Sequence, residues 1–305
     1  MTSGKPLQVA VVGFGRVGQV CAELISMSRD LSLAAIVRRI ATAGGKLPEQ
    51  LRRIPVVTRI SQVKDVQAAL ICVPTNVVEE TVSQILRHGI PIVECATLHG
   101  DALHAHKEMI HKLALRYQAP AIVGAGWDPG ALSVFRCWFA LLTPGGETET
   151  RHHTGISLRH ATMARSVTGV KDALCAEVRT AEGRFQRYVY VELEKGADPD
   201  KITQAIRADP LFLGADTQVF PVESLAALEH EGRGVVIDRR GSPRRLGHQH
   251  LLLEARFEES VLTAQVMLAA ARAVPQLDPG AYFLSEIPLS AMWGEMIEKA
   301  HRDCL

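Results

Sequence analysis

Over the first 125 residues, short apolar runs alternate with amphipathic stretches. The apolar runs have the length of strands buried on both faces, and the stretches between them follow the period of a helix. Strands that alternate with helices predict a doubly wound parallel sheet. We expect strands over residues 7–12, 33–37, 68–73, 90–95 and 119–124, and helices over 17–27, 76–89 and 101–117.

The pattern changes around residue 145, after which alternating residues over 188–193 and 234–239 predict strands of a mostly antiparallel sheet. A strongly apolar helix over residues 260–273 must be covered, and we expect the first domain to cover it. The sequence therefore predicts a first domain over residues 1–125, completed by a C-terminal segment of about 258–305, and an α+β second domain over 126–257.

A glycine-rich motif lies between the first expected strand and the first expected helix. Gly13 allows a tight turn, Gly15 lets a pyrophosphate approach the backbone, and Gly18 lets the helix pack closely. The helix directs its unpaired N–H groups at the phosphates. The motif predicts a Rossmann-type dinucleotide site with contacts from Gly13, Phe14, Gly15, Arg16, Val17 and Gly18.

The second expected strand ends in Arg38-Arg39. An NAD enzyme usually has Asp or Glu here to bond the ribose 2′-OH, whereas arginine accommodates the 2′-phosphate of NADP. Arg38 and Arg39 therefore predict NADP as the cofactor. The alternative is a glycine turn beside two solvated arginines, but the strands, glycines and helix all have the spacing that the motif requires.

Ligands of parallel sheets bind outside the carboxyl ends of the strands. Thr97, His99 and Trp127 follow two of the expected strands, and we expect Trp127 beside the nicotinamide. Asp128 as N-cap and Pro129 as first helical residue predict the start of the next helix. The remaining expected cofactor contacts are Cys72, Val73, Pro74, Thr75, Asp128 and Pro129.

Composition narrows the class of protein. A net charge of +1 gives no sign of a nucleic-acid footprint. No stretch approaches the ~18 apolar residues of a membrane span, and the first residues lack the apolar core of a signal peptide. We therefore expect a cytoplasmic protein that binds neither nucleic acid nor membrane.

Six cysteines without CxxC spacing favour a reduced protein, and Cys21, Cys72, Cys95 and Cys137 lie in apolar segments where they act as small hydrophobes. We expect no metal site, because the histidines at 152, 153, 248 and 250 lack zinc-motif spacing. We expect three further histidines on the solvated face of the 101–117 helix, namely His104, His106 and His111.

These motifs together resemble the meso-diaminopimelate dehydrogenase family over nearly the whole chain, most specifically at Gly126-Trp127-Asp128-Pro129-Gly130. The resemblance implies an NADP-dependent enzyme that oxidises a D-configured amino carbon. Hydride passes to nicotinamide C4, and water hydrolyses the imine to a 2-oxo acid and ammonia. It also implies a homodimer or larger oligomer, with a dinucleotide domain, a dimerisation sheet and a substrate region.

The substrate region departs from the family. Where the family has Asp-x-Tyr-Asp, whose last Asp engages the reacting amine, this chain has Glu94-Cys95-Ala96-Thr97, so Glu94 is the candidate replacement. The family's substrate loop matches at Gly155, Ser157 and His160, but Arg159 replaces a glycine. A pocket that hydrogen-bonds its substrate rejects analogues sharply. We therefore expect a substrate other than meso-diaminopimelate.

Arg159 and Arg187 are candidate anchors for a substrate carboxylate, with a solvated surface position as the alternative for Arg159. His160 is a candidate donor or proton shuttle, with a structural histidine as the alternative. The general base stays open between His99, His160 and Glu94. The expected catalytic residues are His99, Thr97, Trp127 and His160, and the expected substrate-binding residues are Arg159, Arg187, Gly155, Ser157, His152 and His248.

The sequence therefore predicts an NADP-dependent oxidoreductase acting on the amino-bearing α carbon of an amino acid, by oxidative deamination or reductive amination. One alternative is an NADP-dependent oxidoreductase of a hydroxy acid or other small polar substrate, since the fold alone permits both. Another is a non-catalytic NADP-binding sensor or subunit, because the expected pocket carboxylate is missing.

Overall fold

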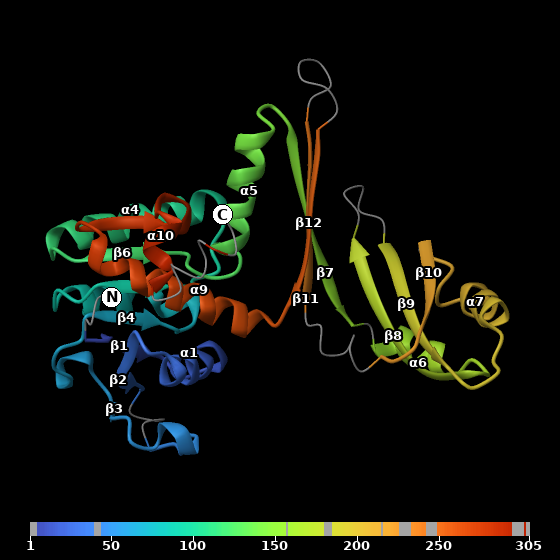
Figure 1. The fold of residues 1–305 in the computed structure, drawn as a ribbon, viewed down its shortest axis with the longest axis horizontal. Helices are drawn as coiled ribbons and strands as arrows, with labels where there is room; N and C mark the ends of the chain where they lie inside the picture. Colours follow the sequence, from blue (N-terminus) through green and yellow to red (C-terminus); the bar gives the residue numbers. More distant parts are fainter. Residues whose placement is uncertain are drawn as a thin grey trace. The chain divides into compact units, whose positions relative to one another are not determined.

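The computed structural model describes residues 5–39, 44–156, 158–179, 185–214, 216–225, 233–241, 249–294 and 302. The chain forms two compact units (Figure 1). Unit 1 contains residues 1–137 and 260–305, and unit 2 contains residues 138–259. Each unit has its own hydrophobic core, so the chain leaves the first core and later returns to complete it.

Unit 1 is built on a seven-stranded sheet in the order β13-β6-β5-β4-β1-β2-β3. Every neighbouring pair of its strands is parallel. Because β1 lies between β2 and β4, the strand order reverses there, which is where open α/β sheets bind ligands. The strands are β1 (Leu7–Val12), β2 (Leu31–Val37), β3 (Val56–Val57), β4 (Ala68–Ile71), β5 (Ile92–Glu94), β6 (Pro120–Val123) and β13 (Gly280–Phe283).

Helices cover both faces of this sheet. One buried cluster joins a sheet face to α1 (Arg16–Met27) and α9 (Glu259–Ala273), and a second joins the other face to α3 (Val78–Leu86) and α4 (Gly100–Arg116). This arrangement confirms the doubly wound fold class. It also confirms that the apolar C-terminal helix is covered by the first part of the chain, since α9 buries Ala264, Met267, Leu268, Ala270 and Ala271.

An ion pair ties α9 to the turn before β2. Arg272 Nε donates to Asp30 Oδ2 at 2.7 Å, and its Nη2 donates to Oδ1 at 3.1 Å. Burial works to raise the pKa of Asp30, but hydrogen bonds from Arg272 and Ser28 outweigh it and lower the pKa to about 2. The paired carboxylate therefore fixes the returning segment to unit 1. The short helix α10 (Leu289–Met292) follows later in the same segment.

Unit 2 contains a six-stranded sheet in the order β10-β9-β8-β7-β11-β12, parallel between β9 and β10 and antiparallel elsewhere. This confirms the mostly antiparallel second sheet. Its core packs β8 and β9 against two helices. The elements are β7 (Glu147–Ile156), α6 (Leu158–Arg165), β8 (Val170–Arg179), β9 (Phe185–Leu193), α7 (Pro199–Ala208), β10 (Asp216–Val222), β11 (Arg233–Arg240) and β12 (His250–Phe257).

Helix α5 (Ala131–Leu142) carries several exposed apolar side chains. Phe135, Trp138, Leu141 and Leu142 are 43%, 50%, 70% and 58% exposed. Cys137 on the same helix is also exposed, so the prediction that it acts as a small interior hydrophobe is wrong. Among the described residues, no helix is both long and apolar enough to span a membrane.

Candidate functional site

The conformation of the glycine loop, residues 13–18, is determined by close contacts between backbone atoms. Gly13 has a φ of +92°, and a Cβ there would lie 2.4 Å from the Cys72 carbonyl oxygen. A Cβ on Gly18 would lie 2.1 Å from the Gly13 carbonyl oxygen, whereas a Cβ on Gly15 would have nothing within 4 Å. The loop is therefore closed beneath Gly13 and Gly18 and open at Gly15, in front of the N-terminus of α1. That cradle fits a pyrophosphate.

Arg38 lies against the glycine loop. Its guanidinium carbon is 5.2 Å from the centre of the Phe14 ring, and its Nη1 donates to the Gly45 carbonyl oxygen at 3.3 Å. The first contact is a cation–π interaction and the second fixes the plane of the guanidinium. Arg39 follows it and is exposed. The end of β2 therefore presents an oriented cation at the position where Rossmann-type sites bind the ribose of a dinucleotide.

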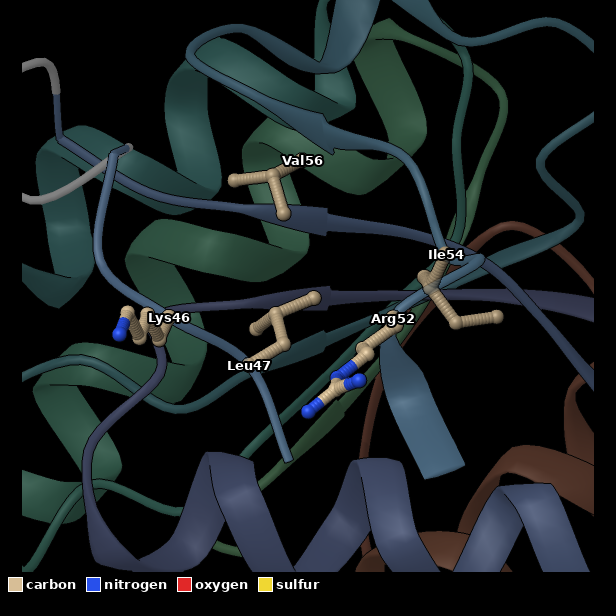
Figure 2. A pocket seen from close by; sticks show the side chains of 5 residues that line it. All are labelled: Lys46, Leu47, Arg52, Ile54 and Val56. Atoms are coloured by element: carbon tan, nitrogen blue, oxygen red, sulfur yellow. The ribbon is translucent and has the colours of Figure 1, made fainter. Parts of the chain in front are cut away.

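Directly after Gly45, the connection to β3 lines a cavity of about 410 Å³ (Figure 2). The cavity combines apolar side chains with two cations, an arrangement suited to an apolar ring that carries an anionic group. Arg52 also lies 3.6 Å from Glu49 on the surface. The lining residues are Lys46, Leu47, Arg52, Ile54 and Val56.

The carboxyl ends of β4 and β5 meet through two hydroxyls. Thr75 Oγ1 lies 3.3 Å from Thr97 Oγ1, so the structure brings together two of the expected site residues. Thr97 and His99 are both exposed, with the less exposed Leu98 between them. In the Cys72–Thr75 segment the Cys72 thiol instead faces the core, 4.0 Å from the Cys21 sulfur and 3.9 Å from the Met267 sulfur, whereas Pro74 is exposed.

Asp128 and Pro129 precede the helix rather than begin it. Helix α5 starts at Ala131, and the Asp128–Pro129 peptide is cis, so the predicted N-cap and first helical position are wrong. The Asp128 carboxylate, 8% exposed, instead accepts two hydrogen bonds from Arg136, at 2.7 and 2.9 Å. Trp127 is half-buried, and its carbonyl oxygen accepts the Leu132 N–H at 3.0 Å.

Glu94, at the end of β5, is fully buried. Its Oε2 accepts the Ala96 N–H at 2.5 Å and its Oε1 accepts the Gly124 N–H at 2.8 Å. His106 Nε2 lies 3.4 Å from the same Oε1. The prediction that Glu94 replaces the missing pocket carboxylate, or acts as the base, is therefore wrong, because both oxygens are engaged inside the fold.

His106 is buried as well, so its expected place on the solvated face of α4 is wrong. Its Nδ1 lies 3.6 Å from Glu79 Oε1, opposite the contact with Glu94. Burial lowers the pKa of the imidazole, but the two carboxylates outweigh it and raise the pKa above its ordinary value. The sequence did hold a signal for this position, because His106 shares the buried helical stripe of Ile110 and Ala114.

His104 and His111 lie on another face of α4. Both line a cavity of about 580 Å³ between α4 and the β13 region. His111 Nδ1 accepts the Ala281 N–H at 3.0 Å, and His104 contacts the Phe283 ring edge-on. These histidines therefore help to seat the C-terminal strand on unit 1.

In unit 2, two expected site residues contact the same short segment. Arg187 on β9 is half-buried, and its Nη1 donates to the Leu211 carbonyl oxygen at 3.2 Å. His160 on α6 is 8% exposed, with the centre of its ring 5.3 Å from the centre of the Phe212 ring in an edge-on arrangement. Both residues therefore lie at the end of this unit's core near Leu211–Phe212.

The structure describes fewer details of the other candidate residues of unit 2. His152, His153 and Gly155 lie on β7 and Arg159 lies on α6. Ser157 and His248 lie outside the described residues. His250 Nε2 lies 3.0 Å from Asp238 Oδ1, in a cluster with Arg240. Within the described ranges, no group of three or more His, Cys, Asp or Glu residues is placed to hold a metal ion.

The chain is similar in sequence to known oxidoreductases. A family model described as an oxidoreductase family with an NAD-binding Rossmann fold matches residues 7–95. A meso-diaminopimelate D-dehydrogenase of Bacteroides fragilis is 33% identical, over 93% of this chain and 94% of that protein. One from Ureibacillus thermosphaericus is 25% identical, over 98% of this chain and 99% of its own.

A solved structure shares the fold over the whole length. The DAP dehydrogenase of C. glutamicum, in complex with DAP, matches with a TM-score of 0.65 and 21% identity, covering 99% of this chain and 100% of the other. At this identity the likeness concerns the fold: the parallel sheet with helices on both faces and the second sheet both have counterparts in a known architecture.

Proposed function

This chain belongs to the meso-diaminopimelate D-dehydrogenase family, and we propose that it deaminates oxidatively an amino acid other than meso-diaminopimelate. The family confirms two predictions: an enzyme, and an oxidoreductase of the amino-bearing carbon of an amino acid. An engineered D-amino acid dehydrogenase of the same fold, bound to NADP⁺, supports NADP as the cofactor. The alternative of a hydroxy-acid oxidoreductase rests on the fold alone, and that of a non-catalytic sensor rests on the missing pocket carboxylate; the family favours an amino-acid dehydrogenase over both. The identity of the substrate and the roles of the site residues are our proposal.

We assign the cofactor to the carboxyl edge of the sheet in unit 1. NADP supplies the hydride acceptor when bound. The open backbone at Gly15 and the N-terminus of α1 hold the pyrophosphate, and Arg38, oriented by Phe14, holds the 2′-phosphate together with Arg39. The segments 72–75 and 127–129 follow β4 and β6, which lie on either side of β5, and are assigned to the nicotinamide half.

We assign Thr97, His99 and Trp127 to the reacting end of the substrate, and Arg187 to its carboxylate. Thr97 and His99 are exposed at the end of β5, which is where a ligand of this sheet binds. Arg187 presents a guanidinium that is already oriented by one backbone carbonyl. Arg159, His160 and His152, with the backbone around Gly155 and Ser157 and with His248, complete the proposed substrate contacts. Positioning of this kind supplies much of the rate of a hydride transfer.

One observation carries the proposal of a different substrate: the burial of Glu94. The family's pattern holds the reacting amine with a carboxylate at the position of Thr97. Glu94 is the one carboxylate in the segment 94–99, and it is fully buried with both oxygens engaged. This strand end therefore offers the amine a hydroxyl rather than a carboxylate, and a pocket changed in this way discriminates against the former substrate.

The test is an assay of NADPH formation by absorbance. The protein is incubated with NADP⁺ and, in turn, with meso-diaminopimelate, single D- and L-amino acids, and hydroxy acids. We expect NADPH with one or more amino acids at a kcat/KM at least tenfold above that with meso-diaminopimelate. Rapid turnover of meso-diaminopimelate contradicts the changed substrate. Turnover of hydroxy acids alone contradicts the amino-acid assignment.

We also propose that the enzyme works as a homo-oligomer in a reducing cytoplasm. The exposed apolar residues of α5, above all Trp138 and Leu141, are the support for a second copy of the chain. The free thiols of Cys21 and Cys72, only 4.0 Å apart, support a reducing compartment. Light scattering tests the oligomer: a monomer at micromolar concentration contradicts it, as does a Trp138→Glu variant of unchanged mass. Cell fractionation tests the compartment.

A further inference from the structure

We propose that Glu94 is a positioning residue: its buried carboxylate joins the two strand ends that carry Thr97 and Trp127, and His106 holds it in place. The inference rests on the proposed function in one respect, since it takes these strand ends as the reacting end of the site. The contacts themselves all lie within unit 1. The pairing of β5 with β4 and β6 does not require the contacts of the Glu94 side chain with backbone N–H groups and with His106.

The carboxylate bridges the two segments that follow the paired residues of β5 and β6. Its Oε2 accepts from the Ala96 N–H, one residue before Thr97. Its Oε1 accepts from the Gly124 N–H, three residues before Trp127. The Glu94 carbonyl oxygen accepts the Ala125 N–H at 2.7 Å. One residue therefore fixes the relative position of the chain after β5 and the chain after β6.

The imidazole of His106 lies beside the carboxylate, on the helical face of the sheet. His106 Nε2 lies 3.4 Å from Glu94 Oε1, and His106 Nδ1 lies 3.6 Å from Glu79 Oε1. The side chain of Glu79 is 69% exposed, whereas those of His106 and Glu94 are buried. A buried carboxylate needs both hydrogen bonds and a counter-charge, and the raised pKa of His106 between the two carboxylates favours the charged form of its imidazole. His106 is therefore the support of Glu94 and does not itself reach the strand ends.

This arrangement predicts an effect on turnover that is separate from nucleotide binding. Neither Glu94 nor His106 has a contact with the glycine loop or Arg38 among the interactions of the described residues. A misplacement of about 1 Å at reacting groups costs on the order of 100-fold in rate. Loosening the two strand ends should lower kcat while the dissociation constant for NADPH stays nearly the same.

The experiment compares Glu94→Gln with the matched control Glu79→Gln, which makes the same change on the other side of His106. Glutamine keeps the shape of glutamate but turns one acceptor into a donor that faces a backbone N–H. In Glu94→Gln we expect hydrogen exchange of the Ala96 and Gly124 amides to rise at least tenfold, kcat to fall at least tenfold, and KM and the NADPH dissociation constant to change less than threefold. In Glu79→Gln all four quantities should stay within threefold.

A pair of variants at His106 keeps the proposal testable if Glu94→Gln does not fold. His106→Gln retains a donor toward Glu94, and His106→Ala removes it, so exchange at Ala96 and Gly124 should rise in the alanine variant and be largely restored in the glutamine variant. Unchanged exchange in Glu94→Gln, or in His106→Ala, overturns the proposal. Raised exchange in a protein that oxidises no amino acid instead supports the positioning role and counts against the proposed function.

Discussion

Units 1 and 2 place their candidate ligand contacts by different means. In unit 1 the loop Gly13–Gly18 is dictated by backbone contacts, because a Cβ on Gly18 would lie 2.1 Å from the Gly13 carbonyl oxygen. In unit 2 the candidates are long side chains, such as Arg187, whose bond to Leu211 is one of many that an arginine can make on an unchanged strand. A site made by the backbone resists substitution, whereas a pocket made by side chains changes while the fold is kept.

The largest effect is expected for Gly18→Ala, which tests the backbone side of the comparison. The new Cβ would meet backbone that cannot yield, so we expect the free energy of unfolding to fall by about 3 kcal/mol, measured by denaturant titration. Gly15→Ala is the control, because its Cβ has nothing within 4 Å. It should keep the stability and bind NADPH about tenfold more weakly. Equal losses of stability in both variants would show that the loop is not specified by these contacts.

Removing both arginines at the end of β2 tests whether side chains of unit 1 also contribute to the recognition of the nucleotide. We expect Arg38→Ala with Arg39→Ala to reduce the preference for NADP⁺ over NAD⁺ about 100-fold, since charge-assisted bonds to the 2′-phosphate are lost. The dissociation constants of both nucleotides are the measurement. Arg53→Ala, at an exposed position of the same connection, is the matched control and should change neither constant. A preserved preference would contradict the arginine assignment.

The variant Arg272→Gln tests whether a change in the stability of unit 1 leaves unit 2 unaffected. We expect unit 1 to lose about 1 kcal/mol at pH 7, because Asp30 loses Arg272, one of the two side-chain partners that together lower its pKa to about 2, and keeps Ser28. A lowered pKa stabilises the fold above the unfolded value near 3.8, and this contribution disappears as pH falls through 2, so the two proteins should converge in acid. Hydrogen exchange of each unit measures the change. Arg29→Gln is the control beside the pair, and an equal loss in unit 2 would contradict the separation.

The smallest effect is expected for Arg187→Lys, which tests the side-chain contacts of unit 2. Lysine cannot reproduce the fork of a guanidinium on a carboxylate, so KM for the amino acid should rise about tenfold while kcat and the melting temperature stay nearly the same. Arg207→Lys is the control, because the Arg207 Nε also donates to a backbone carbonyl, that of Thr217, at 3.0 Å. A similar rise of KM in both variants would show that Arg187 has no special role.

The sequence was sufficient for the features that depend on neighbouring residues. Strands β1, β2, β4, β5 and β6, the helices between them and the turn at Gly13 follow from periodicity and local sterics, and the structure has them within a few residues of the expected ranges. The edge strands β3 and β13 are not among the expected strands. The apolar surface of α9 likewise required a cover, and the parallel sheet supplies it. These elements are determined by the chain segment itself and by the need to bury it.

The misjudged residues depend on partners that are distant in sequence. The sequence alone suggests Glu94 as a pocket carboxylate, because it does not reveal that the Gly124 N–H lies beside this side chain in the folded protein. The sequence places His106 with His104 and His111 on the polar side of the helix, although its own stripe with Ile110 and Ala114 is buried. Asp128 looked like a helix cap, but Arg136, one and a half turns into α5, binds its carboxylate instead. Polar groups find their partners only when the tertiary contacts form.

The return of the chain to unit 1 has a consequence for how the protein is made. Unit 2 is one continuous segment, so a ribosome delivers all of it before α9 and β13 exist. Until then the edge of β6 has no β13 to pair with, and the sheet face beneath α9 has no cover. Unit 2 can fold during synthesis, whereas unit 1 keeps an unpaired strand edge until the C-terminal segment has been made. Nascent chains with unpaired strand edges are prone to aggregate.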